Sequence, residues 1–474
     1  MTDIKELYNT VIKNDFCIGC GGCAVVNKNI KMQLNEYGEF KANVNLEENT
    51  NQNQEVSVLS VCPFSNESPN EDEISKNLYN EIHDIKYDNK LGYYKELYAG
   101  HVAEGDYRKN ASSGGFGTWI LSELFRKDLI DGVIHVKENN NKDIPRLFKF
   151  DISNSIEEIQ NGAKTKYYPV EISEVISKVK HNPGRYAIIG IPCFIKTIRL
   201  LAKEDPIINE RIHFTVGLIC GGQKSSRFAD SLAWQSGIKP GKLKSINFRK
   251  KLINAPADQY GVELIGEDSG EEVIISNRMI DLLGNNWGHG FFKSNPCDFC
   301  DDVMNETADI TIGDAWLPKY SADGKGNNVV LVRNPIISNL LKEGIEGGRI
   351  IVDEISEEDI VKSQDANFRH RRDELGYRLY KEDYKGQWRP KKRVKATKKI
   401  SISRRQIQEM RRRLTRESHI SYDHALKIGD INYFLNNMEK HLKKYNKLYL
   451  VNDIMNKGPK ILFKKALNKI SNKS

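Results

Sequence analysis

The stretch "YAIIGIPCFIKTIRLLAKE" (residues 186–204) contains the repeating unit of an α/β fold. The apolar run "YAIIG" predicts a short buried strand, and the apolar spacing of "FIKTIRLLAKE" predicts a helix. Other apolar runs predict strands at 132–136, 214–219, 308–313 and 329–333, with a further helix at 117–130. Because strands alternate with helices, we expect an α/β fold with a largely parallel sheet.

Two cysteines follow predicted strands. Cys193 comes just after the strand at 186–190, and Cys220 ends the strand at 214–219. The carboxyl ends of parallel strands share one edge of the sheet, where α/β proteins place their ligands. The "CDFC" motif, with Cys297 and Cys300, could close a site there, although one C-x2-C motif is weak by itself. The alternative is that Cys193 and Cys220 are small buried side chains.

The stretch "CIGCGGC" (17–23) places Cys17, Cys20 and Cys23 at two-residue intervals. Such a loop suits a [4Fe–4S] cubane, since the glycines let the backbone approach the sulfides. Cys62, in "SVCPF", is the expected fourth ligand. The main alternative is structural zinc, which prefers two separate C-x2-C knuckles, so the third cysteine fits it poorly. The pattern therefore predicts a ferredoxin-like [4Fe–4S] module over residues 1–75.

The chain has 474 residues, more than one compact core usually holds. A composition of 39% hydrophobic and 29% charged residues is typical of a soluble protein. No apolar run approaches the roughly 20 residues that span a bilayer, and the N-terminus does not resemble a secretory signal. We therefore expect a cytoplasmic protein, whose eight cysteines are ligands or buried thiols rather than disulfides.

Charge is distributed unevenly along the chain. Residues 389–474 contain 24 Lys and Arg against 6 Asp and Glu, a net charge of +18, and the rest carries −10. This basic, helical tail indicates an anionic partner surface. Its last segment, 458–474, has amphipathic spacing that suits an anionic membrane, which would place the protein at the inner face of the cell membrane. The acidic body itself and an acidic ferredoxin are the alternatives. Nucleic acid is disfavoured, because the cysteine pattern indicates iron–sulfur chemistry.

Residues 95–385 resemble the coenzyme F-420 hydrogenase/dehydrogenase beta-subunit family. The matching motifs are "SSGGFGT" (112–118), "TKYYPV" (165–170), "GIPCFI" (190–195), "GLICGG" (217–222), "NFRK" (247–250), "CDFCDD" (297–302) and "ADITIGD" (308–314). "CIGCGGC" and the later "CP" are similar to the ferredoxin-like part of many members. The resemblance implies FAD and a second [4Fe–4S] cluster on Cys193, Cys220, Cys297 and Cys300.

The flavin contacts are expected where "SSGGFGT" opens a helix, because backbone N–H groups at a helix N-terminus attract anions. The expected contacts are Ser112, Ser113, Gly114, Gly115, Thr118, Lys166 and Asp314. Each has a plainer alternative. The loop could be a helix cap with packing glycines, Lys166 a surface lysine, and Asp314 a helix cap. His289 could donate a proton, but a structural role is favoured, so no catalytic residue is assigned.

Three units are expected: the ferredoxin-like module (1–75), a body that binds FAD and [4Fe–4S] (90–385) and the basic tail (389–474). Two iron–sulfur clusters and a flavin would connect a one-electron carrier, such as ferredoxin, to a two-electron acceptor. The predicted function is an oxidoreductase acting on a small or sugar-linked substrate, with a link to polysaccharide biosynthesis. The alternative is an electron-transfer beta subunit of a deazaflavin-dependent hydrogenase or dehydrogenase complex.

Overall fold

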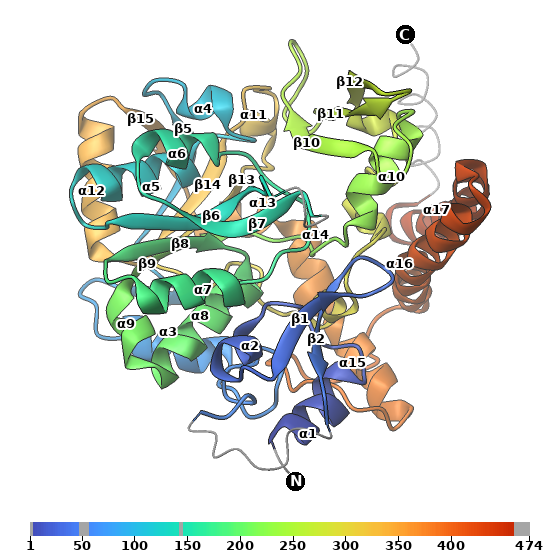
Figure 1. The fold of residues 1–474 in the computed structure, drawn as a ribbon, viewed down its shortest axis with the longest axis horizontal. Coiled ribbons are helices and arrows are strands. Elements are labelled where there is room, and N and C mark those ends of the chain that lie inside the picture. Colours follow the sequence, from blue (N-terminus) through green and yellow to red (C-terminus); the bar gives the residue numbers. More distant parts are fainter. Residues whose placement is uncertain (1–2, 47–55, 142–145, 459–474) are drawn as a thin grey trace.

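The computed structural model describes residues 3–46, 56–141 and 146–458. An eight-stranded sheet forms its centre (Figure 1). From edge to edge, its strands are β15 (Ile350–Glu354), β5 (Glu96–Val102), β14 (Asn328–Val332), β13 (Ile310–Asp314), β9 (Ile212–Leu218), β8 (Tyr186–Gly190), β6 (Gly132–Glu138) and β7 (Phe148–Ser153). The expected α/β class is confirmed as a mixed α/β fold with a helical C-terminal region.

The sheet is parallel only in its centre. β13, β9, β8 and β6 pair in parallel, and β8 has the bounds that the sequence predicted. β7, β14, β5 and β15 pair antiparallel with their neighbours. The prediction of a largely parallel sheet is therefore wrong for the edges. In the pairs β6–β7 and β13–β14, the two strands follow each other in the chain without a long helical crossover, and such a short connection favours antiparallel pairing.

The two faces of the sheet pack against different helices. Ala187 of β8 lies in a core with α5 (Phe116–Arg126) and α12 (Pro335–Glu346). Its neighbour Ile188 lies in the opposite core, with α7 (Ser173–His181) and α8 (Pro192–Glu204). Figure 1 shows α5 on one side of the sheet and α7 and α8 on the other. The alternation follows from the two-residue period of a strand, and it brings α8 to the side where the N-terminal residues pack.

The N-terminal residues pack directly on this body. Leu7, Val11 and Phe16 are buried in the same core as the side chains of α8. The elements here are α1 (Asp3–Leu7), the π-helix η1 (Tyr8–Ile12), α2 (Gly22–Val26), β1 (Ile30–Leu34), β2 (Phe40–Val44) and α3 (Glu71–Tyr79). β1 and β2 form an antiparallel hairpin. A shared core holds the first cysteine cluster in a fixed position relative to the sheet.

Smaller elements complete the body. Two further sheets consist of β3 (Lys86–Asp88) with β4 (Gly92–Tyr94), and of β10 (Leu243–Lys250), β11 (Gly261–Asp268) and β12 (Glu271–Arg278). The remaining α-helices are α4 (Tyr107–Asn110), α6 (Ile156–Asn161), α9 (Pro206–Arg211), α10 (Arg227–Gln235), α11 (Pro318–Ser321), α13 (Glu357–Ser363), α14 (Asp365–Phe368) and α15 (Leu375–Tyr384). The short turns are the 3-10 helices η2 (Met279–Asp281), η3 (Trp287–His289) and η4 (Asn295–Phe299), and the π-helix η5 (Arg369–Asp373).

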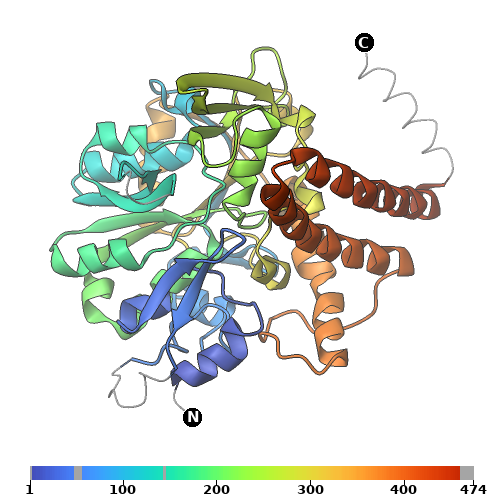
Figure 2. The same ribbon diagram turned by 45° about the vertical axis from the view of Figure 1, so that its right-hand side comes forward.

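The basic tail forms a helical hairpin of α16 (Ile402–Ile428) and α17 (Ile431–Lys457), seen at the edge of the body in Figure 2. Tyr422 and Phe434 are fully buried in the body's core, and their rings lie 5.5 and 5.6 Å from the ring of Phe292. This packing favours the acidic body as the tail's partner. The amphipathic segment on which the membrane expectation rests, apart from Gly458, lies outside the described residues. No helix in the described ranges is long and apolar enough to cross a bilayer.

Candidate redox site

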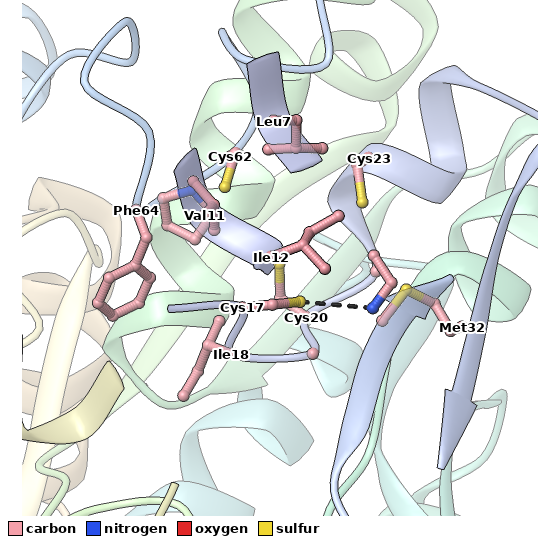
Figure 3. A pocket seen from close by; sticks show the side chains of 14 residues that line it. Leu7, Val11, Ile12, Cys17, Ile18, Cys20, Cys23, Met32, Cys62 and Phe64 are labelled. Atoms are coloured by element: carbon pink, nitrogen blue, oxygen red, sulfur yellow. Dashed lines mark hydrogen bonds between the residues drawn. The ribbon is translucent and has the colours of Figure 1, made fainter. Parts of the chain in front are cut away.

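The first four cysteines surround one cavity. Cys17 and Cys20 lie on the loop that leads into α2, Cys23 lies in the first turn of α2, and Cys62 lies on a turn opposite them. Figure 3 shows their side chains gathered around the cavity, whose other lining residues include Leu7, Val11, Ile12, Ile18, Met32 and Phe64. Sequence reasoning predicted these four residues as one ligand set. The structure brings them together in an apolar pocket.

The loop of the first set needs glycine for two physical reasons. Gly19 and Gly21 have φ angles of 75° and 90°, in the left-handed region that disfavours side chains. A Cβ atom on Gly19 would also lie 2.3 Å from the carbonyl oxygen of Phe40. The close backbone approach places the amide of Ala42, which donates a hydrogen bond to the Cys17 sulfur at 3.4 Å. Hydrogen bonds to ligand sulfurs are among the features that tune iron–sulfur clusters.

Burial raises the pKa of three of these thiols, which keeps them protonated as long as they bind nothing. It raises the pKa of Cys20 to about 11 and the pKa of Cys62 to about 12. It also holds the pKa of Cys23 well above its usual range, with a further contribution from the neighbouring thiols. A coordinated metal reverses this preference, because a coordinating thiol loses its proton. Four thiols around one apolar pocket therefore fit a cationic metal centre.

The second four cysteines also converge. Cys193 is near the start of α8 after β8, Cys220 follows β9, and the "CDFC" residues Cys297 and Cys300 lie on η4 and just after it. Burial, and then the thiols of the other three, hold the pKa of Cys193 well above its usual range. The amide of Gln223 donates a hydrogen bond to the Cys297 sulfur at 3.2 Å. The four cysteines of the second set therefore lie together at the carboxyl ends of the adjacent parallel strands β8 and β9, where the sequence placed them.

Helix α8 connects the two sets. The Thr197 hydroxyl donates to the carbonyl oxygen of Cys193 at 2.7 Å. Thr197 also hydrogen-bonds the Cys20 thiol, which partly offsets the rise in the pKa of Cys20 that burial causes. A Cβ atom on Gly22 would lie 2.5 Å from the Thr197 methyl carbon, so α2 packs closely on α8. One side chain therefore contacts a member of each cysteine set.

Zinc and a [4Fe–4S] cluster place their sulfur ligands at different separations. Within the described ranges, no three His, Cys, Asp or Glu side chains are grouped in a way that could hold one metal ion. A zinc ion would draw its sulfur ligands to ~2.3 Å from a common centre. In a cubane each thiolate binds a different iron, so the four thiolates lie farther apart. Each set contains four cysteines, the ligand number of a [4Fe–4S] cluster, so the residues present fit that group.

The glycine-rich loop begins α5, as expected. Gly115 precedes the helix with a φ angle of 96°, and a Cβ atom on Gly114 would lie within 2.9 Å of Asn328 and the Gly100 carbonyl. The Ser113 hydroxyl donates to the Asn327 carbonyl at 2.8 Å. These contacts agree with the plainer alternative of packing glycines. Thr118 lines a small polar cavity with Asp106, Tyr107, Asn110, Gln160 and Ala163.

Two half-buried lysines border this loop. The amide of Thr165 donates to the Ser112 hydroxyl at 2.9 Å, which brings the "TKYY" segment to the loop. Lys166 donates to the carbonyl oxygens of Gly162 and Ala163, and Lys251 to that of Ser113 at 2.9 Å. Burial lowers the pKa of each lysine to about 8. Neither lysine pairs with a carboxylate among the described residues, so both can accept an anion.

Aromatic side chains continue from Lys166 to the second cysteine set. The Tyr167 ring lies 4.7 Å from that of Trp287, and a Cβ atom on Gly221, next to Cys220, would lie 3.3 Å from Trp287. Asp314 does not face open space, because Arg249 pairs with it at 2.7 Å. Sequence reasoning missed Arg249, Lys251, Tyr167 and Trp287. The "NFRK" motif contains Arg249 and is followed by Lys251, and the "TKYYPV" motif contains Tyr167. The spacing of the two motifs along the chain could not show that these residues lie near one another.

His289 has structural contacts. Its ring packs on those of Tyr445 at 5.2 Å and Phe291 at 5.9 Å. Burial, followed by the charges of Arg411 and Lys224, lowers the pKa of His289 to about 4. An imidazole that is neutral at pH 7 holds no proton for ready donation, which supports the structural alternative.

Two family profiles match adjacent parts of the chain. The coenzyme F-420 hydrogenase/dehydrogenase beta subunit N-terminal profile matches residues 97–177, and the C-terminal profile matches residues 184–358. The chain belongs to the coenzyme F-420 hydrogenase/dehydrogenase beta-subunit family. The resemblance inferred from the motifs is thereby confirmed. The profiles include the second cysteine set and all the expected flavin contacts, whereas Cys17–Cys62 and the tail lie outside them.

Two uncharacterized proteins of Methanocaldococcus jannaschii are similar to this family member, each at 24% identity over 52% of the chain. The matched regions cover 62% of the first protein and 82% of the second. The chain thus spans less than two thirds of the first relative. A chain of the F-420-reducing nickel–iron hydrogenase complex from Methanosarcina barkeri matches at 19% identity with a TM-score of 0.44, over 59% of this chain and 94% of that one.

Proposed function

We propose that this family member is an electron-transfer oxidoreductase of the beta-subunit type, which works with a one-electron carrier and a two-electron partner. The observation that carries the proposal is the position of Thr197 on α8, in contact with Cys20 of the first cysteine set and Cys193 of the second. Adjacent ligand sets are what a chain needs to move electrons through its interior. Of the two functions expected from the sequence, family membership favours the electron-transfer subunit of an F-420-linked complex.

Each proposed cofactor has its own residues. Cys17, Cys20, Cys23 and Cys62 would hold one [4Fe–4S] cluster, and Cys193, Cys220, Cys297 and Cys300 the other. The loop Ser112–Gly115 with Lys166 and Lys251 would bind the diphosphate of FAD, and Tyr167 and Trp287 would border its ring. When bound, the clusters would supply one-electron chemistry and the flavin two-electron chemistry. Asp314 would hold Arg249 in position through its ion pair.

The partners follow from the same chemistry. A ferredoxin-like protein is the proposed one-electron carrier, and a deazaflavin is the two-electron partner that family membership favours. A sugar-linked substrate and a role in polysaccharide biosynthesis find no support in the family or the relatives, so they stay predictions from the sequence. Reduction of coenzyme F-420 by the isolated chain with reduced ferredoxin would support independent turnover. Activity only with a partner subunit would support the role within a complex.

Replacing Cys297 by Ala is expected to halve the iron content. Protein prepared without oxygen should contain about eight irons per chain, because each cubane holds four. Cys297→Ala should leave about four irons, since the first cysteine set is complete without Cys297. Cys17→Ala should leave the cluster of the second cysteine set. Iron and acid-labile sulfide analysis with electron paramagnetic resonance measures both. A protein saturated with zinc and unable to bind iron would refute the proposal.

Replacing Lys166 or Lys251 by Met is expected to weaken FAD binding about tenfold or more, because a hydrogen bond to a charged group contributes ~1.5–3 kcal/mol. Lys109→Met is the control, since Lys109 is 76% exposed. The pKa of both buried lysines is about 8, so FAD affinity should be constant below pH 8 and fall as the pH rises through that value. Fluorescence titration of flavin-free protein measures the affinity. Equal affinity in all three variants would place the flavin elsewhere.

A further inference from the structure

Arg371 is a buried arginine on the π-helix η5, between α14 and α15, with 2% of its surface exposed. The arginines beside it have carboxylate partners: Arg369 pairs with Asp365 at 2.6 Å, and Arg372 with Glu306 at 2.6 Å. No carboxylate of the described residues forms an ion pair with Arg371, and its Nε atom has no hydrogen-bond partner. A buried guanidinium without an anion is strongly unfavourable, so Arg371 requires a negatively charged partner in the folded protein.

The neighbours of Arg371 are the second cysteine set. The three groups that do most to raise the pKa of Arg371 are the Cys300, Cys220 and Cys297 side chains, ahead of Asp302. Arg371 also forms a hydrogen bond with the Cys220 thiol. This bond lowers the pKa of Cys220, whereas burial, the larger effect, raises it. Neutral thiols would leave the guanidinium charge uncompensated. Thiolates bound to iron would compensate it.

The lysine that contacts the first cysteine set already has carboxylate partners. This lysine, Lys41, donates to the carbonyl oxygen of Cys17 at 3.1 Å. Lys41 is already neutralised by Asp15 at 2.7 Å and Glu39 at 3.3 Å. The two sets thus differ in electrostatic surroundings, although their ligands are chemically the same.

We propose that Arg371 is a positioning residue that raises the reduction potential of the cluster held by Cys193, Cys220, Cys297 and Cys300. Reduction adds a negative charge, which a buried cation stabilises, and net charge near a cluster is one of the determinants of its potential. The effect favours movement of electrons from the N-terminal set toward the body. Arg371 lies beyond Glu358, the last residue that the family profiles match. The inference rests on the proposed function, because it requires the second cluster.

The test compares Arg371→Gln and Arg371→Lys in the full chain, with clusters assembled without oxygen. Arg369→Gln is the control, because it removes the same charge from the same turn at an exposed position. The side chains of Arg369 and its partner Asp365 are 40% and 68% exposed. Potentiometric titration followed by electron paramagnetic resonance gives both midpoint potentials. The Cys17→Ala and Cys297→Ala proteins assign each signal to its cluster.

In Arg371→Gln, the ratio of reduced to oxidised second cluster at a fixed potential should fall about tenfold, which is ~59 mV for one electron. The first cluster should not change, Arg371→Lys should restore most of the potential, and Arg369→Gln should match the wild type. Failure of only the Gln variant to assemble the second cluster would also support the need for positive charge.

Two results would overturn the inference. One is a Gln variant with its full iron content and an unchanged potential of the second cluster. The other is loss of the cluster in both variants, which would indicate a structural role for the arginine rather than an electrostatic one. If Cys297→Ala leaves the iron content equal to that of the wild type, the proposed second cluster is instead refuted.

Discussion

A chain ending at Gln387 is expected not to fold. The missing residues include Tyr422 and Phe434, which are fully buried in the main core. Removing a buried aromatic side chain typically costs ~3–5 kcal/mol, and a whole protein has only ~5–15 kcal/mol of stability. Two such losses amount to ~6–10 kcal/mol, comparable to the whole stability of a protein, and the exposure of Phe292 adds to them.

The truncation also removes the partners of buried carboxylates. Arg404 pairs with Glu374, and Arg412 with Glu382 at 2.5 Å. Soluble yield, circular dichroism and thermal unfolding measure the outcome. A chain ending at Gly458 is the control, because it keeps every core residue that the structure describes, and it should unfold close to the wild-type temperature. A folded, stable protein ending at Gln387 would show that the hairpin is a separate appendage.

The central βα unit could be predicted from the sequence because its signals are local. The strand at 186–190 is a continuous apolar run, and the helix after it has a clear apolar face. Cys193 and Cys220 were placed correctly because β8 and β9 are parallel neighbours, in which Gly190 lies opposite Gly217. The edges of the sheet were wrong because strand pairing depends on connections whose direction a hydrophobic pattern does not encode.

The surroundings of the site could not be predicted, because they depend on contacts between distant segments. Lys251 meets the glycine-rich loop across 138 residues through its bond to Ser113. The tail has too many charged residues to look like part of a core. Arg393, Arg404 and Arg412 nevertheless pair with acidic residues of the body, and the aromatic rings of the tail pack on Phe292. The positive charge of the tail predicted an anionic partner surface. It could not distinguish the surface of another molecule from the acidic body of the same chain.

Replacing Arg393 by Met is expected to destabilise the folded state by ~3–5 kcal/mol, because it removes one of the cations that neutralise several buried carboxylates. Arg393 is the residue by which the start of the tail joins the N-terminal region to the second cysteine set. It pairs with Asp72 at 2.6 Å and with Glu306 at 2.6 Å. Its backbone amide also donates to Asp301, next to Cys300, at 3.0 Å.

Arg389→Met provides a matched control. Arg389 lies on the same segment and pairs with Asp383 at 2.9 Å, but the Asp383 side chain is 46% exposed. An exposed ion pair contributes only ~0–1 kcal/mol, because water solvates either charge when the other is removed. Guanidinium unfolding without oxygen should therefore distinguish the two variants by a clear shift in the midpoint for Arg393→Met alone. Equal midpoints would mean that the carboxylates around Arg393 are solvated or neutral, and that the tail does not fix the N-terminal region to the body through this residue.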